Sequence, residues 1–282
     1  MSAMLLTACT GVALKAINTP SYWLSDLRRE SNLHYGNKAH QRLDIYLPGD
    51  DIEARRQLIV FIYGGGWTTG ARENYYFVAD ALTSAGYAVA IPDYIKYPGG
   101  EFPAFVQDVA LSIAWLSANI ERFAAIDDII IMGHSAGAHT GALILTDPGY
   151  LAAHGLDARN ISAFIGMAGP YGFTPKEEHY RNIFANLQDY TRMQPLHFAN
   201  GDEPPMLLMH GSGDTTVLPA NTRKFARKVN DLGGTAMTQF YDNKSHVSIL
   251  LSLSRAFDQK GVILSDILNF LQAKLPQAPD AS

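Results

Sequence analysis

The sequence predicts an α/β fold with a mostly parallel central sheet and helices on both of its faces. Two observations support this fold class. Residues 58–63 and 129–132 are short, continuous runs of β-favouring apolar residues, which is the composition of strands buried on both sides. Between such runs lie segments with apolar residues at helical spacing, for example the one that begins at Pro103. Strands that alternate with helices of this length form parallel sheets.

The predicted elements follow each other without an internal repeat or a clear linker. The alternating segment 42–47, which stops at Pro48, predicts an early strand. The later elements are expected, in chain order, at 58–63 (strand), 74–85 (helix), 88–91 (strand), 103–120 (helix), 129–132 (strand), 136–145 (helix), 163–168 and 206–209 (strands), 219–232 (helix), 236–241 (strand) and 262–274 (helix).

One segment interrupts this alternation and shapes the expected domain organisation. Residues 169–205 contain several aromatic residues and two adjacent prolines, and we expect a small lid over the site there. We expect one α/β domain over residues 21–277, since a chain of 282 residues is within reach of a single such domain. Residues 1–20 precede it as a tail or as the remnant of a signal.

The composition is typical of a folded protein and argues against several classes of function. Apolar residues make up 47% of the chain and charged residues 17%, so a large core can be buried. The formal net charge is −5 and no basic stripe occurs, which argues against a nucleic acid as partner. The single cysteine excludes an intramolecular disulfide and a multi-cysteine metal site, and no His-x-x-x-His pair near a Glu predicts a metallohydrolase. The oligomeric state is left open.

The N-terminal residues allow two interpretations. Residues 5–9 (Leu-Leu-Thr-Ala-Cys) resemble the cleavage box of a bacterial lipoprotein, in which the cysteine carries the lipid. Only eight residues precede Cys9, however, and none of them is Lys or Arg. Either Cys9 is a lipid anchor in the bacterial cell envelope, or it is an incidental cysteine in the tail of a cytoplasmic protein. No later run approaches the ~20 apolar residues of a membrane helix.

A candidate nucleophile lies between a predicted strand and a predicted helix. Residues 133–137 (Gly-His-Ser-Ala-Gly) match the pattern G-x-S-x-G. In this context the turn is so tight that Ser135 takes a strained backbone angle, and the flanking glycines let strand and helix approach without a clash. The hydroxyl then projects above the sheet at a helix N-terminus, where negative charge is favoured. The pattern therefore predicts a nucleophilic serine.

A glycine-rich loop follows the strand predicted at 58–63. Its residues 63–67 read Tyr-Gly-Gly-Gly-Trp, and glycines let backbone N–H groups come close to a developing oxyanion. With this loop the sequence resembles the α/β-hydrolases of the hormone-sensitive-lipase and carboxylesterase kind, which carry H-G-G-G or H-G-G-x-W here. The resemblance implies that Gly65, Gly66 and Ala136 supply the oxyanion hole. Tyr63 replaces the family histidine that braces the loop, and a tyrosine can do so through its hydroxyl.

The resemblance, which covers roughly residues 20 to 275, also implies the remaining catalytic groups. In the family the acid and then the histidine follow the serine along the chain. The acid loop after the strand at 206–209 points to Asp214, and the loop after the strand at 236–241 points to His246. Asp242 stays open as an alternative acid. His210, His134 and His139 are expected to have structural roles.

These residues predict a serine esterase that acts by two-step acyl transfer without a metal or organic cofactor. A small-molecule ester is the expected partner, with Trp67 and Tyr171, and also Phe173, as candidates for lining its pocket. An arylformamidase or an acetyl-sugar esterase would use the same triad, so both stay open as alternatives. A catalytically inactive hydrolase fold used for binding is a third alternative.

Overall fold

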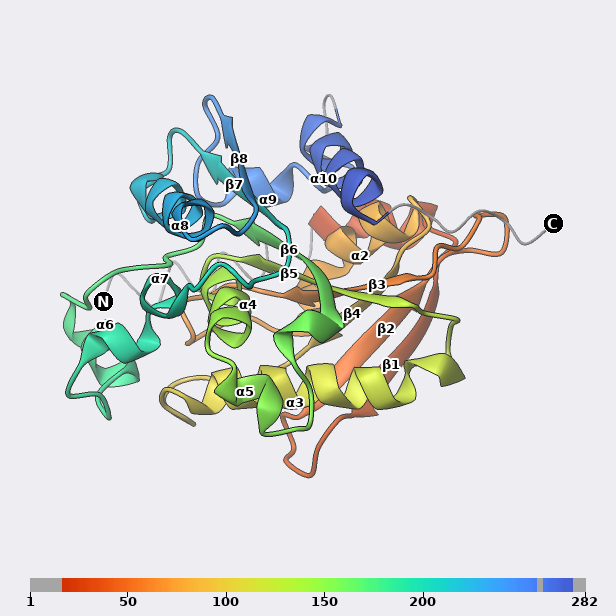
Figure 1. Ribbon diagram of the computed structural model, residues 1–282. Coiled ribbons are helices and arrows are strands. Elements are labelled where there is room, and N and C mark those ends of the chain that lie inside the picture. Colours follow the sequence, from red (N-terminus) through yellow and green to blue (C-terminus); the bar gives the residue numbers. More distant parts are fainter. Residues whose placement is uncertain (1–16, 258–260, 276–282) are drawn as a thin grey trace.

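The computed structural model describes residues 17–257 and 261–275, and it contains an eight-stranded sheet flanked by helices (Figure 1). The strand order is β1-β2-β4-β3-β5-β6-β7-β8. The strands are β1 (Arg28–His34), β2 (Arg42–Leu47), β3 (Gln57–Ile62), β4 (Ala88–Pro92), β5 (Asp128–His134), β6 (Ile161–Met167), β7 (Met206–Gly211) and β8 (Ala236–Tyr241). The predicted mostly parallel α/β fold is confirmed.

The sheet is parallel from β4 to β8, and only its first edge is antiparallel. β2 runs antiparallel to both of its neighbours, β1 and β4. The pairs β4–β3, β3–β5, β5–β6, β6–β7 and β7–β8 are all parallel. Every residue of β3 is buried, which explains the continuous apolar run in its sequence. The loops that follow these parallel strands therefore meet at one edge of the sheet, where open α/β sheets form their sites.

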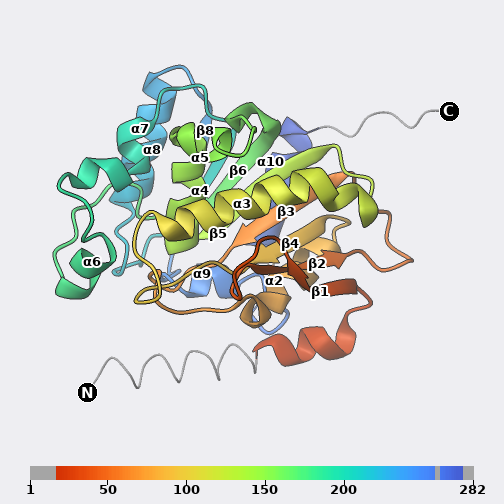
Figure 2. The ribbon, with the colours of Figure 1, turned by 90° about the horizontal axis from the view of Figure 1, so that it is seen from below.

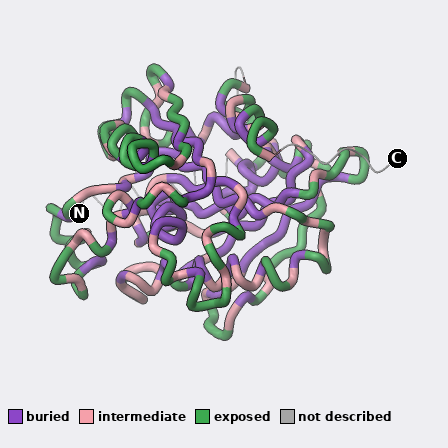
Figure 3. The backbone as a smooth tube through the Cα atoms, in the orientation of Figure 1, coloured by how far each residue is buried: buried purple, intermediate pink, exposed green. Residues whose placement is uncertain are grey.

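Helices cover both faces of the sheet. Figure 1 shows α2 (Tyr76–Thr83) and α10 (Val262–Lys274) on one face, and α3 (Ala104–Asn119) and α4 (Ala136–Thr146) on the other. Seen from below, α3 crosses in front of the sheet (Figure 2). α8 (Ala220–Asp231) packs on β7 and β8. The buried residues concentrate in the strands and on the inner sides of these helices (Figure 3).

Several elements were not expected from the sequence. β1 was missed because it is an exposed edge strand, and so it lacks the apolar run that marks the central strands. The helix predicted at 74–85 begins instead with a 3-10 turn, η1 (Arg72–Tyr75), followed by α2. The remaining short elements are α5 (Gly149–Ala152), α6 (Glu178–Ile183), α7 (Pro195–Phe198), α9 (Ser248–Leu251), η2 (Ile120–Arg122), η3 (Ala158–Asn160) and η4 (Tyr190–Met193).

The described chain begins with a short helix at residues 17–24. Cys9 lies outside the described residues, so both interpretations of the N-terminus stay predictions, as does the division at residue 20. Within residues 17–257 and 261–275, none of the helices is both long and apolar enough to cross a membrane.

Candidate active site

Ser135 forms the sharp turn between β5 and α4. Its backbone angles are φ 55° and ψ −120°, a conformation that residues other than glycine rarely adopt. A Cβ atom at Gly137 would lie 2.0 Å from the carbonyl oxygen of Ile62, and one at Gly133 would lie 2.6 Å from the carbonyl of Gly137. The backbones of β5, β3 and α4 are therefore in direct contact here, and a side chain at Gly133 or Gly137 would clash with them.

The structure brings Ser135, His246 and Asp214 together in a single line of hydrogen bonds. The Nε2 atom of His246 lies 2.8 Å from the Oγ atom of Ser135, and its Nδ1 atom lies 2.8 Å from Oδ2 of Asp214. Because a carboxylate accepts, Nδ1 of His246 carries the proton, which leaves Nε2 free to accept the serine proton. The side chain of Asp214 is fully buried, and its Oδ1 accepts the backbone N–H groups of Thr216 and Val217, both at 2.9 Å. The alternative acid, Asp242, is exposed to solvent.

His210 also contacts Asp214, a contact that the sequence interpretation did not foresee. Its Nε2 atom lies 3.1 Å from Oδ2 of Asp214 and 2.8 Å from the carbonyl oxygen of Val217. Both partners are acceptors, so Nε2 carries a proton, and burial lowers the pKa of His210. Nδ1 of the neutral ring therefore accepts the hydroxyl of Thr222 at 2.7 Å. The spacing of four residues between His210 and Asp214 across a strand end is the sequence signal that could have indicated this contact.

His134, the residue before Ser135, holds the main chain of the loop that carries His246. Its Nε2 atom donates to the carbonyl oxygen of His246 at 2.8 Å. Burial, followed by the nearby charge of His246, lowers the pKa of His134 to about 3. The ring is therefore a neutral hydrogen-bond donor across the physiological range.

The glycine loop lies beside Ser135, and Gly65, Gly66 and Ala136 all line the same pocket as the serine. Gly65 and Gly66 have φ values of 117° and 59°, and a Cβ at Gly65 would lie 2.3 Å from the carbonyl oxygen of Thr69. The backbone N–H groups of these three residues donate to no acceptor within residues 17–257 and 261–275. Their donors are thus available to a ligand, although their role in an oxyanion hole stays a prediction.

Tyr63 braces this loop through a buried polar network. Its hydroxyl donates to Oδ1 of Asp93 at 2.6 Å, and burial raises the pKa of this phenol well above its usual value. Asp93 also accepts the backbone N–H of Arg72 at 3.0 Å and pairs with the guanidinium of the same residue. The hydroxyl of Tyr94 donates to the carbonyl oxygen of Tyr63 at 2.9 Å. Side chain and main chain of Tyr63 are therefore both fixed directly before the glycines.

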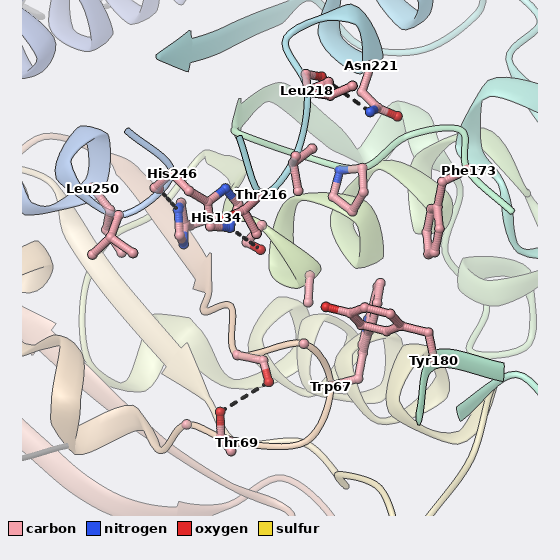
Figure 4. A pocket seen from close by; sticks show the side chains of 18 of the residues that line it. Trp67, Thr69, His134, Phe173, Tyr180, Thr216, Leu218, Asn221, His246 and Leu250 are labelled. Carbon is pink, nitrogen blue, oxygen red and sulfur yellow. Dashed lines mark hydrogen bonds between the residues drawn. The ribbon is translucent and has the colours of Figure 1, made fainter. Parts of the chain in front are cut away.

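Ser135 lines a pocket of about 590 Å³, and Figure 4 shows side chains around this pocket. Trp67 and Phe173 are among the residues that line it, and their contact with a substrate stays a prediction. The assignment of Tyr171 to the pocket is wrong, because its fully buried ring stacks on Phe225 with a centroid distance of 4.6 Å. Tyr171 belongs to the core between the end of β6 and α8.

The segment predicted as a lid forms one wall of the pocket. Phe173, Lys176 and Tyr180 are among the residues that this segment contributes to the lining. A closing movement of this wall stays a prediction. No group of three or more His, Cys, Asp or Glu side chains that could hold a metal ion occurs in the described part of the chain.

Comparisons with known proteins agree with this fold. Residues 43–229 match the family model BD-FAE. The isoprenylcysteine alpha-carbonyl methylesterase ICME of Arabidopsis thaliana is 26% identical over 277 residues, which cover 90% of this chain and 64% of that protein. The esterase LipC of Mycobacterium tuberculosis is 28% identical over 216 residues, which cover 69% of this chain and 53% of LipC. The chain thus spans between 53% and 64% of the length of these two curated relatives.

Solved structures of esterases share the fold at low sequence identity. Esterase B from Lactobacillus rhamnosis superposes with a TM-score of 0.76 at 18% identity, covering 96% of this chain and 93% of that chain. The apo form of Thermogutta terrifontis esterase 2 gives a TM-score of 0.73 at 22% identity, covering 90% and 97% of the two chains. The predicted α/β-hydrolase fold is therefore confirmed.

Proposed function

The chain belongs to the BD-FAE family, and from this premise we propose that it is a serine carboxylesterase that hydrolyses small carboxylic esters through an acyl-enzyme intermediate. The observation that carries the proposal is the pair of 2.8 Å contacts that His246 makes with Ser135 and with Asp214. Curated relatives are named as esterases, methylesterases or carboxylic ester hydrolases, which supports the same reaction class.

The first half of the reaction forms the acyl-enzyme. Nε2 of His246 takes the proton of Ser135 as Oγ attacks the ester carbonyl, and Asp214 stabilises the imidazolium. The N–H groups of Gly65, Gly66 and Ala136 bind the oxyanion of the tetrahedral intermediate. Each such donor typically contributes about 2.7–4 kcal/mol to transition-state stabilisation. His246 then protonates the leaving alcohol, and the acyl group remains on Oγ.

The second half releases the acid. Water takes the place of the alcohol, gives a proton to Nε2 of His246 and attacks the acyl carbon. The bond between the acyl carbon and Oγ then breaks, the acid leaves, and His246 returns the proton to Oγ. The pocket supports this exchange because it is open to solvent at the exposed residues Lys176, Glu177 and Val247.

The test is hydrolysis of p-nitrophenyl esters from acetate to decanoate by the wild type and by Ser135→Ala, alongside labelling with a fluorophosphonate. We expect wild-type rates that peak at short acyl chains, and loss of both turnover and labelling in the variant. Labelling without ester turnover would point to the formamide alternative. A folded protein with neither labelling nor turnover would favour the binding role, and turnover retained by Ser135→Ala would remove Ser135 as nucleophile.

A further inference from the structure

The pocket has two ends of different chemistry, one beside His246 and one lined by aromatic side chains. Figure 4 shows Leu250 on the His246 side and a group of aromatic side chains on the opposite side. The aromatic end is formed by Trp67, Phe173 and Tyr180. The aliphatic end is formed by Val247, which directly follows His246 and is the N-cap of α9, and by Leu250 and Leu251, the last two residues of α9.

The direction of proton transfer decides which part of an ester meets which end. The leaving oxygen must receive its proton from Nε2 of His246, so in the tetrahedral intermediate the alcohol lies on the His246 side. The oxyanion points to the glycine loop, and the acyl group takes the remaining direction, toward the aromatic end. The alcohol of a bound ester therefore contacts the residues that follow His246.

The aliphatic end offers an alcohol apolar contact and no charge. Leu250 is 3% exposed and packed in place, whereas Val247 is 46% exposed at the rim, unusually open for a valine. Among the described lining residues the permanent charges are Lys176 and Glu177, and both belong to the wall that carries Phe173 and Tyr180. A polyhydroxylated alcohol at the aliphatic end would lose hydration without gaining partners from these side chains.

We propose that the alcohol subsite, formed by Val247, Leu250 and Leu251, selects esters of uncharged aliphatic alcohols over esters of polyols. This inference rests on the proposed function, since it assumes that Ser135 and His246 act on an ester. It adds a preference on the leaving-group side that the catalytic groups themselves do not determine.

The experiment fixes the acyl group and varies only the alcohol. Release of acetic acid from ethyl, butyl and hexyl acetate and from glycerol monoacetate is followed by pH-stat titration. The three simple alkanols are leaving groups of similar basicity, so differences in kcat/KM among them report contacts with the chain. Each methylene that becomes fully buried favours binding about fourfold. We expect kcat/KM to rise by about tenfold or more from ethyl to hexyl acetate, and glycerol monoacetate to lie below butyl acetate.

Matched variants locate the subsite. Val247→Asn should lower the hexyl-to-ethyl ratio of kcat/KM, while Val262→Asn should keep it, because Val262 is similarly exposed (49%) but does not line the pocket. Phe173→Leu, at the aromatic end, should also keep the ratio. A ratio cancels any general loss caused by disturbing the neighbouring His246, because such a loss affects every ester alike.

The outcomes separate this inference from the proposed function. No Ser135-dependent hydrolysis of any ester would remove the proposed function and the inference with it. Ser135-dependent hydrolysis with a flat alcohol series, or with glycerol monoacetate as the best substrate, would overturn the inference alone. A ratio that falls in Phe173→Leu and persists in Val247→Asn would show that the two ends are assigned the wrong way round.

Discussion

His134 donates a hydrogen bond of 2.8 Å to the main-chain carbonyl of His246, so the residue that precedes Ser135 holds the loop that carries His246. The two residues are 112 positions apart in the chain, and their rings lie 5.0 Å from each other. Ser135 and His246 are thus coupled twice, through the contact of the Ser135 hydroxyl with the imidazole and through the bond from His134 to the main chain of His246.

Replacing His134 should slow catalysis without weakening substrate binding. His134→Leu leaves the carbonyl of His246 without this donor, and a lost hydrogen bond of about 1 kcal/mol corresponds to roughly a fivefold fall in kcat. His134→Gln keeps a donor and should recover much of the rate. Steady-state kinetics on p-nitrophenyl butyrate measure both parameters. Equal rates in the two variants, or an effect confined to KM, would contradict a positioning role.

Tyr63→Phe tests the brace of the glycine loop. The change removes the 2.6 Å bond to Asp93, and we expect a loss of about 1 kcal/mol in unfolding free energy together with a several-fold lower kcat. Tyr35→Phe is the matched control, because the hydroxyl of Tyr35 donates to the main-chain carbonyl of the same Asp93, also at 2.6 Å, without touching the glycine loop. The control should lose stability and keep its kcat. If both variants lose activity equally, the effect belongs to Asp93 as a whole.

His210 should help to hold the carboxylate of Asp214 through its hydrogen bond to Oδ2. His210→Leu removes one of the donors to this carboxylate, so Asp214 is held less firmly and aligns the ring of His246 less well. We expect kcat on p-nitrophenyl butyrate to fall several-fold while KM stays the same. Asp242→Asn, a change at an exposed carboxylate near the same loop, should keep its kcat. An unchanged kcat in His210→Leu would limit His210 to packing.

Stability should fall in acid because two buried histidines resist protonation. Burial lowers the pKa of His134 to about 3 and that of His139 to about 4. The unfolded chain binds these protons near pH 6.5, so stability is complete above that pH and declines as the pH falls toward the folded values. Each histidine should remove about 2 kcal/mol by pH 5. Urea unfolding between pH 7.5 and 5 measures the slope, which His139→Gln should reduce. A slope that this variant leaves unaltered would assign the acid sensitivity to other groups.

Gly137→Ala should disrupt the turn that presents the serine. The added Cβ would lie 2.0 Å from a main-chain oxygen of Ile62, which cannot move aside as a flexible side chain could. We expect a loss of more than about 3 kcal/mol, in the range of severe core overpacking. Gly155→Ala is the control, since Gly155 has a positive φ of 74° but no atom within 4 Å of the added Cβ. It should cost only about 1 kcal/mol of backbone strain. Similar thermal shifts in the two variants would contradict the steric argument.

The sequence by itself determined the parts of this protein that depend on local pattern. The apolar runs predicted the bounds of the central strands within a residue or two. Strands that are buried on both faces consist of apolar residues throughout, so they are easy to recognise in the sequence. The glycines around Ser135 indicated a tight turn, and the loops after β7 and β8 contained the residues that the structure brings to Ser135.

Only the tertiary structure decided which way side chains point and which distant residues meet. Tyr171 and Phe173 are two residues apart, yet Tyr171 turns into the core and Phe173 into the pocket. The contact of His210 with Asp214, the hold of His134 on His246 and the separation of an aliphatic from an aromatic end all arise from loops of different strands that meet above the sheet. Such contacts depend on three-dimensional packing, and a periodic pattern along one chain does not encode them.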